Sequence, residues 1–64
     1  MITEKFIRLP QVMERTTRSK PAIYVDIKKG LFPAPVKIGL RAVAWREADV
    51  INWMTERVTT RVAA

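Results

Sequence analysis

The segment from Leu31 to Pro35 constrains the fold most, because it is apolar yet cannot be helical. Pro33 and Pro35 each push the residue before them into extended backbone. Gly30 stands directly before this segment, where a residue in the left-handed conformation commonly ends a helix. The sequence therefore predicts helical structure before residue 30 and an extended path after it.

Two short helices are expected before this segment. Pro10 suits the first turn of a helix that ends near residues 14–15. Ser19 stands where an N-cap belongs, so a second helix is expected over residues 20–29. About four residues join the two helices. This spacing is typical of a helix-turn-helix, although any small helical bundle contains such a pair.

The second helix has two unlike faces. Each residue turns the helix by about 100°, so Ile23 and Ile27 share a face that we expect to point into the core. The opposite face is expected to carry Pro21, Tyr24, Val25 and Lys28, with Lys20 and Lys29 beside them.

A β-hairpin is expected after the prolines. Residues 36–38 alternate apolar and basic side chains, as a half-buried strand does, and residues 42–45 can return as the second strand. Arg41 would then lie at the hairpin tip with Lys37 nearby. A basic hairpin beside a helix-turn-helix is a wing. Residues 6–9 are either a short strand or an extended lead-in.

A third helix is expected to start at about Glu47, where acidic residues favour the positive end of the helix dipole. Its core-facing stripe is predicted to hold Val50, Trp53, Met54 and Val58. The predicted fold is mainly α with a small β-hairpin: three helices in a winged helix-turn-helix, one domain over residues 1–64, with residues 1–5 and 59–64 frayed.

Length and composition exclude most chemistry. The chain has 64 residues with no cysteine and no histidine, so thiolate nucleophiles and imidazole bases are missing. Glu47 and Asp49 are two apart on a helix and do not face each other. Ser19 lacks a base to activate it. We therefore expect no enzyme, no cofactor, no metal and no small-molecule substrate.

Positive charge is concentrated in the middle of the chain. Residues 15–41 hold seven Lys and Arg residues and one acid, and so carry the whole net charge of +6. Such a block is a footprint for a polyanion. Trp45 and Trp53 are expected in the core rather than stacked on bases, and Arg46 is expected to serve the structure. No apolar run could span a membrane and no signal peptide is seen, so a cytoplasmic, nucleoid-associated location is expected.

These residues resemble the AlpA-type regulators of prophages. The shared motifs are Arg8-Leu9-Pro10, Ser19-Lys20 followed by Ile23-Tyr24, Phe32-Pro33, Pro35-Val36-Lys37 and the run from Gly39 to Glu47. The resemblance covers roughly residues 6–54 and is most specific over residues 32–47. It implies a winged helix-turn-helix protein of the MerR-like excisionase group that binds duplex DNA and regulates transcription. The chain departs from the usual family residues at Thr17 (glycine), Pro21 (serine) and Val25 (arginine).

With that resemblance, the second helix is expected to enter the major groove, and the hairpin to contact flanking backbone or minor groove. Double-stranded DNA is the expected partner, with integrase or further copies of the chain as additional ones. The candidate DNA-binding residues are Arg18, Ser19, Lys20, Tyr24, Val25, Lys28, Lys29, Lys37 and Arg41.

Two other interpretations remain open at this point. In the first, the chain is an excisionase-type recombination directionality factor that bends attachment-site DNA. In the other alternative it is a non-enzymatic adaptor or inhibitor that binds an acidic protein partner through the same basic face.

Overall fold

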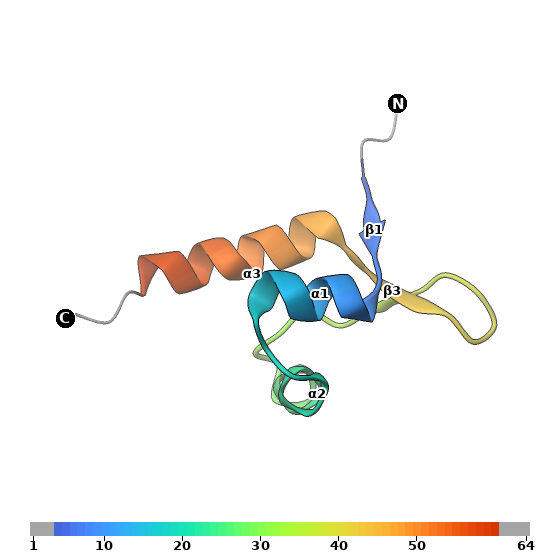
Figure 1. Ribbon diagram of the computed structural model, residues 1–64, viewed down its shortest axis with the longest axis horizontal. Coiled ribbons are helices and arrows are strands. Elements are labelled where there is room, and N and C mark those ends of the chain that lie inside the picture. The colour runs from blue at the N-terminus through green and yellow to red at the C-terminus, as the bar shows by residue number, and fades with distance from the viewer. Residues whose placement is uncertain (1–3, 61–64) are drawn as a thin grey trace.

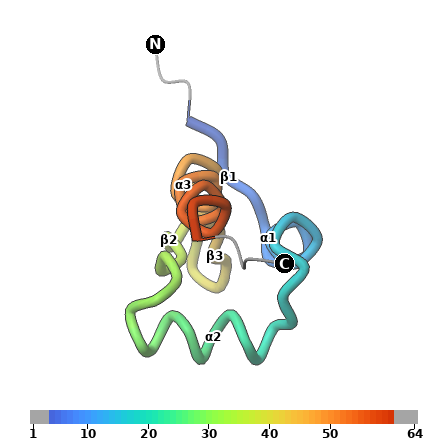
Figure 2. Tube along the Cα trace, turned by 90° about the vertical axis from the view of Figure 1, so that its left-hand side faces the viewer, coloured from blue at the N-terminus to red at the C-terminus, as the bar shows by residue number. Residues whose placement is uncertain are grey.

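Three helices and three short strands follow one another in the computed structural model, which describes residues 4–60 (Figure 1). The chain runs through β1 (Phe6–Ile7), α1 (Leu9–Thr16), α2 (Lys20–Lys28), β2 (Val36–Lys37), β3 (Val43–Arg46) and α3 (Glu47–Thr59). Figure 2 shows α2 running across the direction of α3 and α1, with β2 and β3 between α2 and α3. This arrangement confirms the predicted winged helix-turn-helix.

The strands form one antiparallel sheet in the order β1-β3-β2. β2 and β3 make the expected hairpin, with Lys37 opposite Val43. β1 pairs with the other edge of β3, where Ile7 lies opposite Trp45. Residues 6–7 are therefore a strand, and the predicted hairpin is part of a three-stranded sheet.

Local signals set the helix ends. Pro10 lies in the first turn of α1, and the Ser19 hydroxyl accepts a hydrogen bond of 3.4 Å from the backbone N–H of Ala22 at the start of α2. Gly30 follows α2 with φ +73°, the left-handed conformation expected there. Thr17, directly after α1, has φ +58°, which side-chain-bearing residues rarely adopt.

One cluster of buried side chains holds the elements together. Its members are Ile7, Val12, Ile23, Phe32, Trp45 and Val50, and the partly buried Leu9, Met13, Ile27, Trp53 and Met54 pack against it. The core positions predicted for α2 are confirmed, as are those for the first half of α3.

The predicted core position at Val58 is wrong, because this side chain is 53% exposed. The C-terminal half of α3 extends beyond the rest of the molecule (Figure 1). The apolar stripe of this helix therefore continues past the end of the core. Of the ends expected to fray, residues 1–3 and 61–64 lie outside the described part, while α3 continues to Thr59. None of the described helices has both the length and the apolar character needed to cross a membrane.

Candidate nucleic-acid interface

The outer face of α2 carries the residues predicted to contact DNA. Ile23 is fully buried on the inner side of this helix. The candidates on or beside the outer side are all exposed: Ser19, Lys20, Tyr24, Val25, Lys28 and Lys29. The structure thus gathers six of the nine candidate residues on one helix and its two capping residues.

Tyr24 also has a packing role. Its ring meets the indole of Trp45 edge-on, with centroids 6.4 Å apart and an interplanar angle of 66°. Tyr24 nevertheless stays 37% exposed. Because Trp45 is fully buried in β3, this contact joins Tyr24, at the edge of the outer face of α2, to the second strand of the wing.

The wing presents Lys37 on the side of the sheet that α2 contacts. Lys37 lies opposite Val43 in the β2–β3 pair, and directly opposite residues of an antiparallel pair share a face. Val43 and Trp45 are two apart on β3, so they point the same way. Trp45 contacts Tyr24 on that side. Lys37 therefore projects from the face turned toward α2.

Arg41 lies in the exposed turn of the wing. The backbone N–H of Ile38 donates a 2.9 Å hydrogen bond to the carbonyl oxygen of Ala42. This bond closes a short loop over residues 39–41, all of which are exposed. The tip of the wing extends away from the helices (Figure 1), so Arg41 is free to meet a partner.

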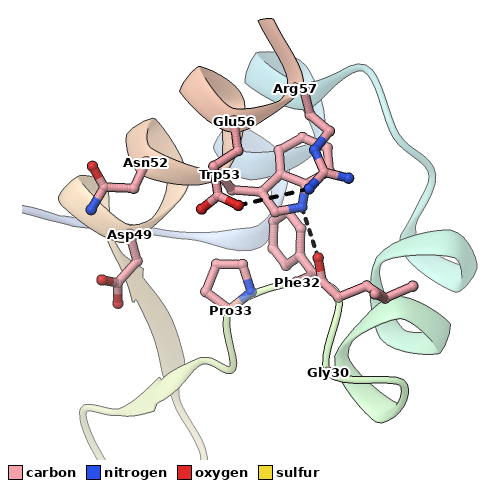
Figure 3. Close-up of a pocket in the computed structure, with 9 residues that line it drawn as sticks. Gly30, Phe32, Pro33, Asp49, Asn52, Trp53, Glu56 and Arg57 are labelled. Carbon is pink, nitrogen blue, oxygen red and sulfur yellow. Dashed lines mark hydrogen bonds and ion pairs between the residues drawn. The ribbon is translucent and has the colours of Figure 1, made fainter. Parts of the chain in front are cut away.

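Two tryptophans hold the connection between α2 and the wing. The Trp45 indole N–H donates to the carbonyl oxygen of Pro33, and the Trp53 indole N–H donates to that of Leu31, each at 2.9 Å. Phe32 packs edge-on against Trp53, with centroids 5.0 Å apart (Figure 3). Both tryptophans serve the packing of the protein, as expected from the sequence.

Ion pairs divide the basic block of residues 15–41 into two groups. Arg15 binds Glu47 at 2.8 Å and Arg18 binds Asp26 at 2.5 Å. Within residues 4–60, the other five cations of the block form no ion pair. These are Lys20, Lys28 and Lys29 on or next to α2, and Lys37 and Arg41 on the wing. The uncompensated charge of this block therefore lies on or next to the two elements predicted to contact DNA.

Arg18 differs from the other candidates. Its guanidinium is held by Asp26 of α2, and its buried Nε has no hydrogen-bond partner among the described residues. The predicted phosphate contact of Arg18 stays a prediction, with Asp26 competing for the same charge. Arg46 pairs with Glu4 and, at 3.7 Å, with Asp49, which confirms its expected structural role.

Two features of this surface are not predicted from the sequence. Asp26 is the one acid of the basic block, and its pairing with Arg18 is seen only in the structure. Leu40, in the turn of the wing, is 93% exposed. A leucine between Gly39 and a basic residue in a predicted turn is the signal that points to it.

A separate open pocket of about 380 Å³ lies between α3 and the segment after α2. Asp49, Asn52, Trp53, Glu56 and Arg57 line its α3 side (Figure 3). Arg57 lies 5.0 Å from the centre of the Trp53 ring. With two carboxylates in its wall, this pocket does not match the charge of nucleic acid.

Comparisons with known proteins agree on one family. The family described as Prophage CP4-57 regulatory protein (AlpA) matches residues 5–58. The uncharacterized protein ORF88 of Enterobacteria phage P4 is 41% identical over 58 residues, which cover 91% of this chain and 66% of that protein. The chain thus spans just under two thirds of the phage protein.

A second relative carries a functional name. The DNA-binding transcriptional activator AlpA of Escherichia coli (strain K12) is 27% identical over 59 residues, which cover 83% of this chain and 84% of that protein. No solved structure shows a significant match. The family match extends over the helix-turn-helix, the wing and most of α3, and the chain belongs to the AlpA family of prophage regulatory proteins.

Proposed function

We propose that this protein is a sequence-specific, double-stranded DNA-binding regulator of prophage genes. In this proposal α2 enters the major groove, which is wide enough to admit a helix. The wing lies along the flanking backbone or minor groove. Lys20, Tyr24, Val25 and Lys28 face base edges and nearby phosphates, while Ser19 and Lys29 lie at the two ends of α2 beside the backbone.

The distribution of unpaired cations supports this proposal most strongly. Seven basic side chains lack an acidic partner within residues 4–60, and five of them lie on α2, directly after it or on the wing. The Tyr24–Trp45 contact joins these two elements, so phosphate contacts from both can be made without a large rearrangement. The name of the Escherichia coli relative adds independent support.

The proposal is tested by binding isotherms on duplexes that the wild-type chain selects from a random-sequence pool. Binding is followed by fluorescence anisotropy between about 50 and 200 mM salt. Affinity should fall steeply with salt, because each phosphate contact contributes about 0.9 to the log–log slope. Lys28→Ala and Arg41→Ala should each weaken binding. Each should also lower the slope by about 0.9, the value of one lost phosphate contact.

Lys5→Ala is the matched control. Lys5 is exposed and pairs with no acid within residues 4–60, but it lies beside β1, on the other side of the molecule from α2 (Figure 1). Lys5→Ala removes one positive charge, as Lys28→Ala does, and should leave the salt slope nearly unchanged. Equal losses of DNA affinity in Lys5→Ala and Lys28→Ala would show that binding depends only on net charge, and would count against a defined interface.

The two alternative roles are separated by other assays. An excision assay with purified integrase tests the recombination directionality factor, since a regulator of transcription alone leaves excision unchanged. A pull-down with and without nuclease tests the adaptor. A protein partner retained after all DNA has been destroyed favours the adaptor over the DNA-binding regulator.

A further inference from the structure

Leu40 is the most exposed large apolar side chain among the described residues, at 93%. It lies in the turn of the wing between Gly39 and Arg41. Burying an aliphatic side chain is favourable and exposing it is not, so a leucine held almost fully in water gains most if a partner covers it.

The hairpin places Leu40 at the projecting end of the wing. The Ile38–Ala42 hydrogen bond of 2.9 Å closes the loop at its base, and the β2–β3 pairing continues behind it through Lys37 and Val43. The loop therefore projects as a narrow tip. Leu40 is one of the residues of this loop, and no described side chain covers it. Arg41 follows Leu40 directly and Lys37 lies three residues before it, so the chain carries a cation on each side of the apolar residue.

This pattern of an apolar tip flanked by cations matches the chemistry of the DNA minor groove. Two rows of phosphates border that groove and attract cations. Apolar side chains at the end of a protein arm can enter between base pairs, unstack one step and kink the duplex. A neutral protein surface would match the apolar tip but would not account for the cations beside it.

We propose that Leu40 is a wedge that inserts into one base step in the minor groove and kinks the DNA. Lys37 and Arg41 hold the flanking phosphates while Leu40 enters the step. The side chain gains a partner that excludes water, and the unstacked step is the cost. This inference rests on the proposed function, because it assigns a bending activity to the same DNA-binding surface.

The test measures the bend separately from binding. A duplex selected by the wild-type chain carries a donor and an acceptor dye at its two ends, and energy transfer reports the kink. A second copy of the duplex carries 2-aminopurine in the flank beneath the wing, where unstacking raises its fluorescence. The variants are Leu40→Ala and Leu40→Met, with Val58→Ala as control, because Val58 is an exposed aliphatic residue on the far half of α3.

Wild type and Leu40→Met should kink the duplex and raise the 2-aminopurine signal, since methionine is also found as a wedge. Leu40→Ala should lose both signals while its affinity falls by no more than about tenfold, because the lost burial is offset by the avoided unstacking. A single-nucleotide gap at the kinked step removes the cost of unstacking, so it should raise the affinity of wild type and change that of Leu40→Ala little. Val58→Ala should behave as wild type throughout.

Failure of the wedge and failure of the DNA-binding proposal give different results. If wild type binds no duplex, the proposed function fails. If wild type binds without bending, or if Leu40→Ala bends DNA as wild type does, the wedge is overturned while DNA binding stands. Loss of self-association in Leu40→Ala with an unchanged bend would also overturn the wedge and assign the tip to a contact between copies of the chain.

Discussion

The indole N–H of Trp45 donates a hydrogen bond of 2.9 Å to the carbonyl oxygen of Pro33. Trp45 lies on β3, whereas Pro33 belongs to the segment that joins α2 to the wing. Proline has no N–H, so this segment makes few backbone hydrogen bonds of its own. The fully buried indole therefore supplies a donor at the place where the wing is positioned relative to α2.

Replacing Trp45 with phenylalanine should lower the free energy of unfolding by about 3 kcal/mol. The variant leaves the Pro33 carbonyl without its donor and opens a cavity beneath the sheet. Trp53→Phe is the comparison, because it removes an equivalent bond to Leu31 from a half-buried ring, and it should cost about 1 kcal/mol. Urea denaturation followed by circular dichroism measures both. Equal costs would show that burial of the indole does not set the strength of this connection.

Thr17 has a left-handed backbone conformation, which the residue type alone did not reveal. The resemblance to the AlpA-type regulators leads us to expect glycine at position 17, and the φ of +58° at Thr17 explains why glycine would suit that position. Sequence alone marked the substitution, but only the structure shows that it forces a threonine into a conformation that costs about 1 kcal/mol or more.

Thr17→Gly should therefore stabilise the protein by about 0.5–1 kcal/mol, since glycine adopts positive φ without steric cost. The gain is limited by loss of the 2.6 Å hydrogen bond from the Thr17 hydroxyl to the Thr16 carbonyl. Thr17→Ala keeps the strain and removes the same bond, so it should not stabilise. Thermal unfolding of the two variants gives the comparison, and a gain shared by both would point away from backbone strain.

Gly30→Ala is expected to act in the opposite direction. Gly30 has φ +73°, and a Cβ added there would meet no other atom within 4 Å. The cost is then that of the backbone conformation alone, about 1 kcal/mol. A chemical denaturation curve with an unchanged midpoint would mean that the end of α2 rearranges without loss.

Most of the helical part of this fold follows from local residue patterns, and the sheet follows less completely. Ser19 and Gly30 bound α2 as their chemistry predicts, because caps act within one turn of the helix. β1 is only two residues long and pairs with Trp45 and Arg46 far along the chain. A dipeptide pattern cannot distinguish such a strand from an extended lead-in. Val58 continues the helical periodicity of α3, but periodicity carries no information on where the core ends.

The candidate interface shows the same division between local and distant information. Exposure of the outer face of α2 was predictable, since the positions of Ile23 and Ile27 fix which side turns inward. The pairing of Arg15 with Glu47 was not predictable, because the two residues are 32 positions apart. Counting charges located the basic block, and only the ion pairs show which of its cations remain available.

Ser19 allows helix stability and DNA affinity to be separated. Its hydroxyl caps α2 through a long bond of 3.4 Å to the N–H of Ala22, so Ser19→Ala should cost about 0.5–1 kcal/mol of stability. Ser19→Asp retains a capping oxygen and places a negative charge at the positive end of the helix dipole, so stability should be kept. That same charge would repel phosphates and weaken DNA binding. Parallel melting and binding measurements check both effects, and an aspartate variant with full DNA affinity would remove Ser19 from the interface.

Asp26→Asn should strengthen DNA binding although it weakens an ion pair. Asp26 holds Arg18 at 2.5 Å and is the acid within the basic block. Asparagine can still accept a hydrogen bond from the guanidinium, so the loss of stability should be roughly 1 kcal/mol for this partly exposed pair. The freed charge of Arg18 adds up to one phosphate contact, which steepens the log–log salt slope by about 0.9. Glu56→Gln makes the same change in charge on exposed α3 and should leave the slope unchanged. If both variants raise affinity equally, the gain comes from net charge, and Arg18 contacts no phosphate.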